Sequence, residues 1–315
     1  FTLPDKTGWQ VNPTLMIWQQ RQWLDEQLLR GGFDAVLVHY LHAAAPLARI
    51  AARTADIPLW IDVNEGMSSV LAEGQQGLHR WLLKQLSAAD VVIAQCSVQK
   101  ADLQSALPGK QIRVIPLAIE DAAPAAIPPD APPLQCICVS RLDLRSKCVD
   151  RLLRAVAAVR SVDGTDLRLT ITGDGYLRNE LQQLAGELGI AEAVRFVGWQ
   201  SPEELREMLR SQHFAVQPSE HESFGLAALE AAAAGLPLVA GTRAGVVPDL
   251  VSAGAALRTF HSSSPAELAQ AIRDIRDRWP ELQRQAIEAR GRIHERYSWR
   301  AHTSLYAALF RSLGK

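Results

Sequence analysis

Short apolar runs alternate with stretches of helical periodicity along most of the chain. In the first part, apolar runs occupy residues 35–38, 58–63, 91–94 and 112–115. The alternation resumes with runs at 135–140, 167–172, 194–197, 214–216 and 236–240. Strands that are apolar on both faces and joined by helices are typical of a parallel sheet covered on both sides. The pattern predicts an α/β protein with two doubly wound, Rossmann-like parallel-sheet domains.

A proline-rich segment separates the two series of strands. Residues 121–133, DAAPAAIPPDAPP, contain five prolines and little that can pack. Such composition is typical of a linker, so we predict one domain over 1–120 and a second over 134–297. From about Pro265 onward the periodicity is helical, and an amphipathic terminal helix is predicted over 299–313, within a closing segment 298–315.

Composition excludes several classes of protein. The 315 residues carry a net charge of −1, which offers no long-range attraction for nucleic acid. No apolar run approaches the ~20 residues that span a bilayer. The cysteines show neither a disulfide framework nor metal-ligand spacing, so we expect them to be buried and reduced, in a cytoplasmic setting. They are Cys96, Cys136, Cys138 and Cys148.

Polar residues follow the strands of the second domain. Ligands of open parallel sheets bind beyond the carboxyl ends of the strands, where these residues are expected. Arg141 and Lys147 follow the first strand and are candidates for neutralising a diphosphate, although a solvated loop is the alternative. Gly173, Asp174 and Gly175 follow the second strand and permit close backbone approach of a ligand, or form an ordinary turn.

The stretch ESFGLAALEAAAAG, residues 222–235, predicts a helix. Ser223 is expected to cap its start, and Gly235 its end. Free backbone amides at the start would then form an anion site. Glu222 beside that site either accepts hydrogen bonds from sugar hydroxyls or is merely a favourable acidic residue near a helix N-terminus. The amides concerned are those of Phe224, Gly225 and Leu226.

Glu230 is the only charged residue in this apolar helix, which predicts that its carboxylate is buried. A buried carboxylate without partners costs several kcal/mol, so Glu230 requires hydrogen-bond donors. The two hydroxyls of a ribose can supply them. A structural ion pair with a nearby arginine is the alternative.

Four segments of the second domain, taken in order, resemble the retaining glycosyltransferases of family 4, which have the GT-B fold. The segments are SRLDLRSK, ITGDGYLRNEL, VRFVGW and PSEHESFGLAALEAAAAGLPLVAG, and they contain two glutamates eight positions apart. The resemblance implies catalytic roles for Glu222, Arg141 and Lys147, and places Glu230 at the ribose. It further implies donor binding by Ser223, Phe224, Gly225, Leu226, Gly173, Asp174, Gly175, Phe196, Val197 and Gly198.

The first domain resembles the later part of the family's acceptor domain. Asn64 stands where the family usually has a histidine, and Glu65 follows it. The candidate residues on the acceptor side are therefore His39, His42, Asn64 and Glu65, with a structural role as the alternative for both histidines. The family's opening strand and glycine-rich loop have no counterpart, so we expect roughly 60 residues to be missing upstream.

By this resemblance, the chain moves a sugar from a nucleoside-diphosphate sugar, such as a UDP-sugar or GDP-sugar, to an acceptor hydroxyl with retention of configuration. No metal and no other cofactor is expected. The expected acceptor is a glycan or lipid-linked saccharide of a bacterial cell surface, with peripheral contact at the inner face of the cytoplasmic membrane. A nucleotide-sugar epimerase and a non-catalytic nucleotide-binding module are the alternatives.

Overall fold

The computed structural model describes residues 26–28, 30–39, 45–63, 76–120, 133–143, 145–219, 222–242, 244–261 and 264–312. Nearly all of the predicted linker, 121–132, lies outside these residues. The candidates His42, Asn64 and Glu65 lie outside them as well.

The first domain contains a parallel four-stranded sheet in the order β1-β2-β3-β4. The strands are β1 (Val36–His39), β2 (Leu59–Asp62), β3 (Val91–Ala94) and β4 (Ile112–Val114). All four coincide with the predicted apolar runs. The agreement is expected for β2 and β3 in particular, because these strands are buried along their whole length. One face of this sheet packs against α2 (Ala45–Ala55), α4 (Gln76–Ser87) and α5 (Ser97–Ala106).

The second domain contains a parallel six-stranded sheet in the order β10-β9-β8-β5-β6-β7. The edge strand β10 (Leu257–Phe260) was not predicted, because its two apolar residues stand at its ends and form no continuous apolar run. The other five agree with the predicted runs to within two residues at either end. They are β5 (Leu134–Val139), β6 (Leu167–Thr172), β7 (Val194–Gly198), β8 (Phe214–Gln217) and β9 (Leu238–Gly241).

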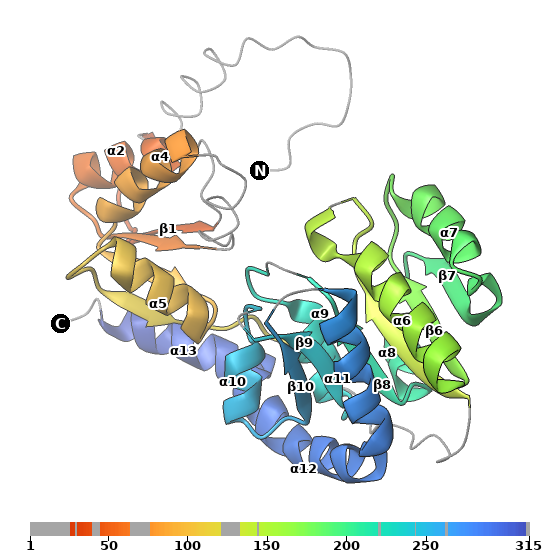
Figure 1. Ribbon diagram of the computed structural model, residues 1–315. Helices are drawn as coiled ribbons and strands as arrows, with labels where there is room; N and C mark the ends of the chain where they lie inside the picture. The colour runs from red at the N-terminus through yellow and green to blue at the C-terminus, as the bar shows by residue number, and fades with distance from the viewer. Residues whose placement is uncertain are drawn as a thin grey trace.

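Helices cover both faces of the second sheet, which confirms the predicted doubly wound architecture (Figure 1). One face packs against α6 (Val149–Asp163), α7 (Arg178–Glu187) and α11 (Pro265–Asp277). The other packs against α8 (Pro202–Arg210), α9 (Leu226–Ala233), α10 (Val247–Ser252) and α12 (Trp279–Tyr297). All four cysteines are buried, as predicted, and none of them forms a disulfide within the described residues.

The terminal helix α13 (Trp299–Arg311) leaves the second domain and runs beneath the first (Figure 1). Ser298 caps it by accepting a hydrogen bond from the amide of Ala301. Its Leu309 packs with Trp60 of β2 on the sheet face opposite α5, and the rings of Phe310 and Trp60 lie 5.1 Å apart. α13 therefore completes the core of the first domain.

Two further contacts join the domains. The amide of Ile119 donates to the carbonyl of Tyr297 at 2.9 Å, and the amide of Ser97 donates to the carboxylate of Asp249 at 2.9 Å. In the part of the chain that the structure describes, no helix combines the length and apolar character needed to cross a membrane.

Candidate functional site

An ion pair joins two loops at the carboxyl edge of the second sheet. β5 and β8 are neighbours, so the loops that follow them lie side by side. The loop after β5 carries Lys147 in a single turn of 3₁₀ helix, Arg145–Lys147, and the loop after β8 carries Glu222. Lys147 Nζ lies 2.7 Å from Glu222 Oε1, and the two side chains are only 16% and 12% exposed. The predicted candidates Lys147 and Glu222 therefore form one mostly buried, charged pair.

The predicted helix start at Ser223 is wrong. α9 begins at Leu226, and its N-cap is Gly225 in the left-handed conformation, with φ of 87° and no side-chain cap. A Cβ at Gly225 would lie 3.3 Å from the amide nitrogen of the Gln217 side chain, so close packing as well as φ favours glycine. Residues 222–224 thus form a loop, in which Phe224 is buried and its carbonyl accepts the amide of Val246.

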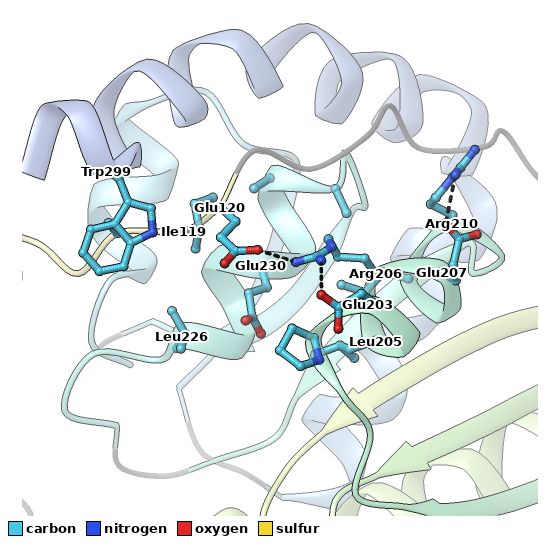
Figure 2. Close-up of a pocket in the computed structure, with 15 residues that line it drawn as sticks. Ile119, Glu120, Glu203, Leu205, Arg206, Glu207, Arg210, Leu226, Glu230 and Trp299 are labelled. Carbon is cyan, nitrogen blue, oxygen red and sulfur yellow. Dashed lines mark hydrogen bonds and ion pairs between the residues drawn. The ribbon is translucent and has the colours of Figure 1, made fainter.

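Glu230 lies on the second turn of α9, at the wall of a cavity of about 480 Å³. Burial raises the pKa of this carboxyl to about 7. The positive charge of Arg206 lowers the pKa, but by less than burial raises it. Figure 2 shows Arg206 bonded instead to Glu120, at 2.9 Å, and to Glu203, at 3.1 Å. Among the described residues, the side chain of Glu230 has no hydrogen bond or ion pair, so the alternative of a structural arginine pair is not formed.

Arg141, the other predicted cation of this loop, is not part of the buried pair, because its side chain is 68% exposed and lies 3.6 Å from Asp143. The loop that carries it rests on the predicted glycine turn. The amide of Leu142 donates to the carbonyl of Asp174 at 2.9 Å. A Cβ at Gly173 would collide with the carbonyl of Ser140, and one at Gly175 with that of Leu142. Both glycines therefore hold the Arg141 loop in place.

The end of β7 lies beside the same turn. The amide of Gly173 donates to the carbonyl of Gly198 at 2.8 Å. Arg178 ties the two segments together by reaching the carboxylate of Asp174 and the carbonyl of Phe196, both at 3.0 Å. The segment 196–198 and the glycine turn thus form one continuous edge. Trp199, which follows Gly198 and is 73% exposed, is a candidate that the sequence analysis missed.

On the first domain, His39 lies at the end of β1 and its Nδ1 is 3.0 Å from Asp62 Oδ2. Tyr306 of α13 bonds to the same oxygen at 3.1 Å. Sequence reasoning missed Asp62 and Tyr306. The one signal available was a carboxylate at the end of an otherwise apolar strand, since no pattern pairs it with a tyrosine 244 residues away.

No group of three histidine, cysteine, aspartate or glutamate side chains that could hold a metal ion occurs within the described ranges. The charged groups at the carboxyl edge include the cations Arg141 and Lys147 and the carboxylate Glu222. Such an edge can bind an anion through its cations and hydroxyl groups through its carboxylate.

Two family models match the chain. The model for glycosyl transferases group 1 matches residues 120–292, and the model for the glycosyl transferase 4-like domain matches residues 2–118.

Curated relatives include D-inositol 3-phosphate glycosyltransferase of Streptomyces coelicolor, 38% identical over 49% of this chain and 35% of its own length. Glycogen synthase of Mycobacterium tuberculosis is 32% identical over 78% of this chain and 58% of its own length. The chain thus spans about a third to three fifths of the length of these two relatives.

Solved structures with the same fold include sucrose-phosphate synthase of Thermosynechococcus elongatus, with a TM-score of 0.78 and 20% identity over 96% of this chain and 80% of that one. HepE of Anabaena, solved in complex with UDP and glucose, has a TM-score of 0.75 and 20% identity over 96% of this chain and 81% of its own. At this level of identity the likeness shows the GT-B fold.

Proposed function

Because the chain belongs to the glycosyl transferases group 1 family, we propose that it transfers a sugar from a nucleoside-diphosphate sugar to an acceptor hydroxyl. The observation that carries the proposal is that Lys147 and Glu222 are paired at the carboxyl edge of the second sheet, while Glu230 on α9 is a half-buried carboxylate without a hydrogen bond or ion pair among the described residues. A nucleotide sugar carries a diphosphate that Lys147 can bind and ribose hydroxyls that can donate to Glu230.

The diphosphate lies against Arg141 and Lys147 in this proposal. Two cations stabilise the charge that develops on the β-phosphate as the bond to the sugar breaks, which is the role a divalent metal plays elsewhere. Lys147 suits this role because Glu222 holds its ammonium group at a defined point. The proposed reaction is accordingly independent of metal.

The ribose lies against Glu230. Its two hydroxyls donate to the two carboxylate oxygens, which replaces the hydrogen bonds that burial removed. The cavity beside Glu230 is large enough for a nucleoside and has an apolar floor that includes Leu226 and Leu205. The kinship with proteins such as HepE, solved with UDP and glucose, supports UDP as the first nucleotide to test.

We further propose that configuration is retained. Glu222 is held by Lys147 beside the diphosphate, so it is suited to bind hydroxyls of the donor sugar and is not a free nucleophile. The acceptor then attacks from the face that the diphosphate leaves. The bond between sugar and β-phosphate breaks, the bond to the acceptor oxygen forms, and the acceptor proton passes to the departing phosphate oxygen. The product is a glycoside and a nucleoside diphosphate.

The acceptor is proposed to be a sugar, polyol or lipid-linked saccharide of the cell surface, reached from the cytoplasmic side. Its site lies on the first domain near His39, at the carboxyl edge of the sheet there. Relatives such as the inositol phosphate glycosyltransferase of Streptomyces coelicolor support a hydroxyl-rich acceptor.

The test measures UDP affinity by calorimetry and sugar transfer with a panel of UDP-, GDP- and ADP-sugars. Glu222→Gln should keep nucleotide affinity and lose transfer, because the amide oxygen of glutamine can still accept from Lys147 and hold it at the diphosphate, whereas the charged contact to the sugar is lost. Arg141→Ala should lower both. The matched control is Arg145→Ala, which removes a neighbouring exposed arginine that is bonded to Glu180.

Equal behaviour of Arg141→Ala and Arg145→Ala would remove Arg141 from the site. A product in which the donor sugar has changed without any acceptor would indicate an epimerase. Tight nucleotide binding with no turnover of any donor would indicate a binding module.

A further inference from the structure

A histidine, an aspartate and a tyrosine meet at the carboxyl edge of the first sheet. His39 and Asp62 are register partners at the ends of β1 and β2, so their side chains leave the sheet together. Tyr306 comes from α13, and its hydroxyl donates to Asp62 Oδ2, the same atom that His39 Nδ1 approaches at 3.0 Å. The aspartate side chain is 7% exposed, whereas that of His39 is 57% exposed.

The charge of Asp62 depends on these two neighbours. Burial raises the pKa of its carboxyl, and the hydrogen bonds from Tyr306 and His39 lower it again, together with the nearby ring of His302. Its other oxygen, Oδ1, is buried without a partner in the part of the chain that is described. Loss of either donor therefore favours the protonated carboxyl.

The protonation state of Asp62 decides which nitrogen of His39 carries hydrogen. An ionised carboxylate can only accept, so it selects the imidazole form with hydrogen on Nδ1 and a free lone pair on Nε2. A protonated carboxyl donates to Nδ1 and places the hydrogen on Nε2. Only the first form presents a hydrogen-bond acceptor on the exposed side of the ring.

We propose that Tyr306 is a positioning residue that, by donating to Asp62, keeps His39 in the Nδ1–H form, so that Nε2 accepts a hydrogen bond from the hydroxyl of the acceptor. This role rests on the proposed function, because an acceptor hydroxyl is its substrate. It also makes the acceptor side of the first domain depend on a helix that begins in the second. When α13 packs against the first domain, Tyr306 therefore also fixes the position of the hydrogen on the His39 ring.

The test compares Tyr306→Phe with the parent by nitrogen NMR of the full chain labelled at histidine. Phenylalanine keeps the aromatic ring at this position. The centroid of the Tyr306 ring lies 5.0 Å from that of His302 and 6.4 Å from that of His39. The parent should show His39 protonated at Nδ1. The variant should shift the ratio of the two forms toward Nε2–H by roughly tenfold, the value of one hydrogen bond to a charged group.

Tyr297→Phe is the matched control, because the hydroxyl of Tyr297 is buried with no hydrogen-bond partner among the described residues. It should leave the His39 signals unchanged. A parent with His39 protonated at Nε2, or a Tyr306→Phe variant with an unchanged ratio, would overturn the proposal whether or not the chain transfers sugar.

Kinetics supply the second measurement. With the acceptor that the donor panel identifies, Tyr306→Phe should raise the acceptor KM roughly tenfold and leave the Kd of UDP unchanged, because the nucleotide lies on the other domain. An unchanged acceptor KM would contradict the contact between His39 and the acceptor. Absence of transfer by the parent would refute the proposed function, and the NMR result would still decide the role of Tyr306.

Discussion

At the scale of single residues, Glu230 combines a cost to stability with a proposed role in binding. Its carboxyl keeps a proton in the folded chain up to about pH 7 because burial raises its pKa, whereas in the unfolded chain it ionises near 4.5. The stability it contributes is therefore complete below about pH 4.5 and is lost as the pH rises through about 7. Above neutral pH, the ionised carboxylate lowers the stability of the folded chain, which is not expected of a residue whose only role is to stabilise the fold.

Glu230→Gln should accordingly make the chain more stable at about pH 8, by up to about 3 kcal/mol, and change little at about pH 4.5. The reason is that glutamine has no charge to desolvate. Urea unfolding at the two pH values measures this difference. A variant less stable than the parent at the higher pH would mean that Glu230 is paired inside the protein after all.

The same substitution should weaken UDP binding, and more so as the pH rises. An ionised carboxylate accepts from both ribose hydroxyls, so the affinity ratio of parent to variant should grow between about pH 6 and about pH 8. Calorimetry with UDP at both pH values measures the ratio, and comparison with the variant removes the titration of the phosphates. A constant ratio would place the ribose away from Glu230.

At the scale of elements, the glycine turn after β6 positions the loop that carries Arg141 and Lys147. Gly173 has a φ of 113°, and a Cβ there would meet the carbonyl of Ser140. Gly164 at the end of α6 also has a positive φ, of 64°, but a Cβ there would meet nothing within 4 Å. Both glycines thus have a positive φ, but only Gly173 combines a φ outside the left-handed region of other residues with a collision.

Gly164→Ala should cost about 1 kcal/mol of unfolding free energy, and Gly173→Ala about 1–3 kcal/mol more. Gly173→Ala should also lower UDP affinity, because the displaced loop carries the proposed diphosphate ligands. Urea unfolding and calorimetry on the pair of variants measure both effects. Equal costs would show that the loop adapts and that the turn does not position it.

The sequence predicted nine of the ten strands found among the described residues, because each of the nine contains an apolar run that can be recognised without knowing its neighbours. It failed where a tertiary contact decides. The start of α9 moved from Ser223 to Leu226 because Gly225 adopts a left-handed conformation against Gln217, and no local propensity encodes that contact. The strand β10 was not predicted because its two apolar residues, Leu257 and Phe260, stand at its ends and form no continuous apolar run.

At the scale of the whole molecule, the candidate groups divide between two domains that the sequence treats separately. The motifs predicted Lys147 and Glu222 as candidates of one site, and the order of β5 and β8 explains why they touch. Asp62 and Tyr306 could not be paired from sequence, because only the passage of α13 beneath the first sheet brings them together. Contacts between the two domains, such as that of Tyr306 with Asp62, are therefore known only from the structure and not from the sequence.

Asp249 is the charged residue that most directly holds the domains together. Its carboxylate accepts from the amide of Ser97 at the start of α5, in the first domain, and from Arg296 of α12, both at 2.9 Å. It is only 7% exposed. The hydrogen bonds therefore act where water competes little, and each to a charged group is worth about 1.5–3 kcal/mol.

Asp249→Asn should loosen the contact between the domains, because the new amide group must face either the Ser97 amide or the Arg296 guanidinium, and both are donors. The radius of gyration measured by X-ray scattering should increase. Sugar transfer should fall, because closure of the two domains aligns the acceptor, whereas UDP affinity should be kept, because the nucleotide needs only the second domain.

Asp163→Asn is the matched control. Its carboxylate also has two partners, Arg273 at 2.7 Å and Arg276 at 3.4 Å, but both belong to the second domain. It should lower stability without changing the radius of gyration. An unchanged radius in Asp249→Asn would show that other contacts, such as those of α13, and not this carboxylate set the arrangement of the two domains.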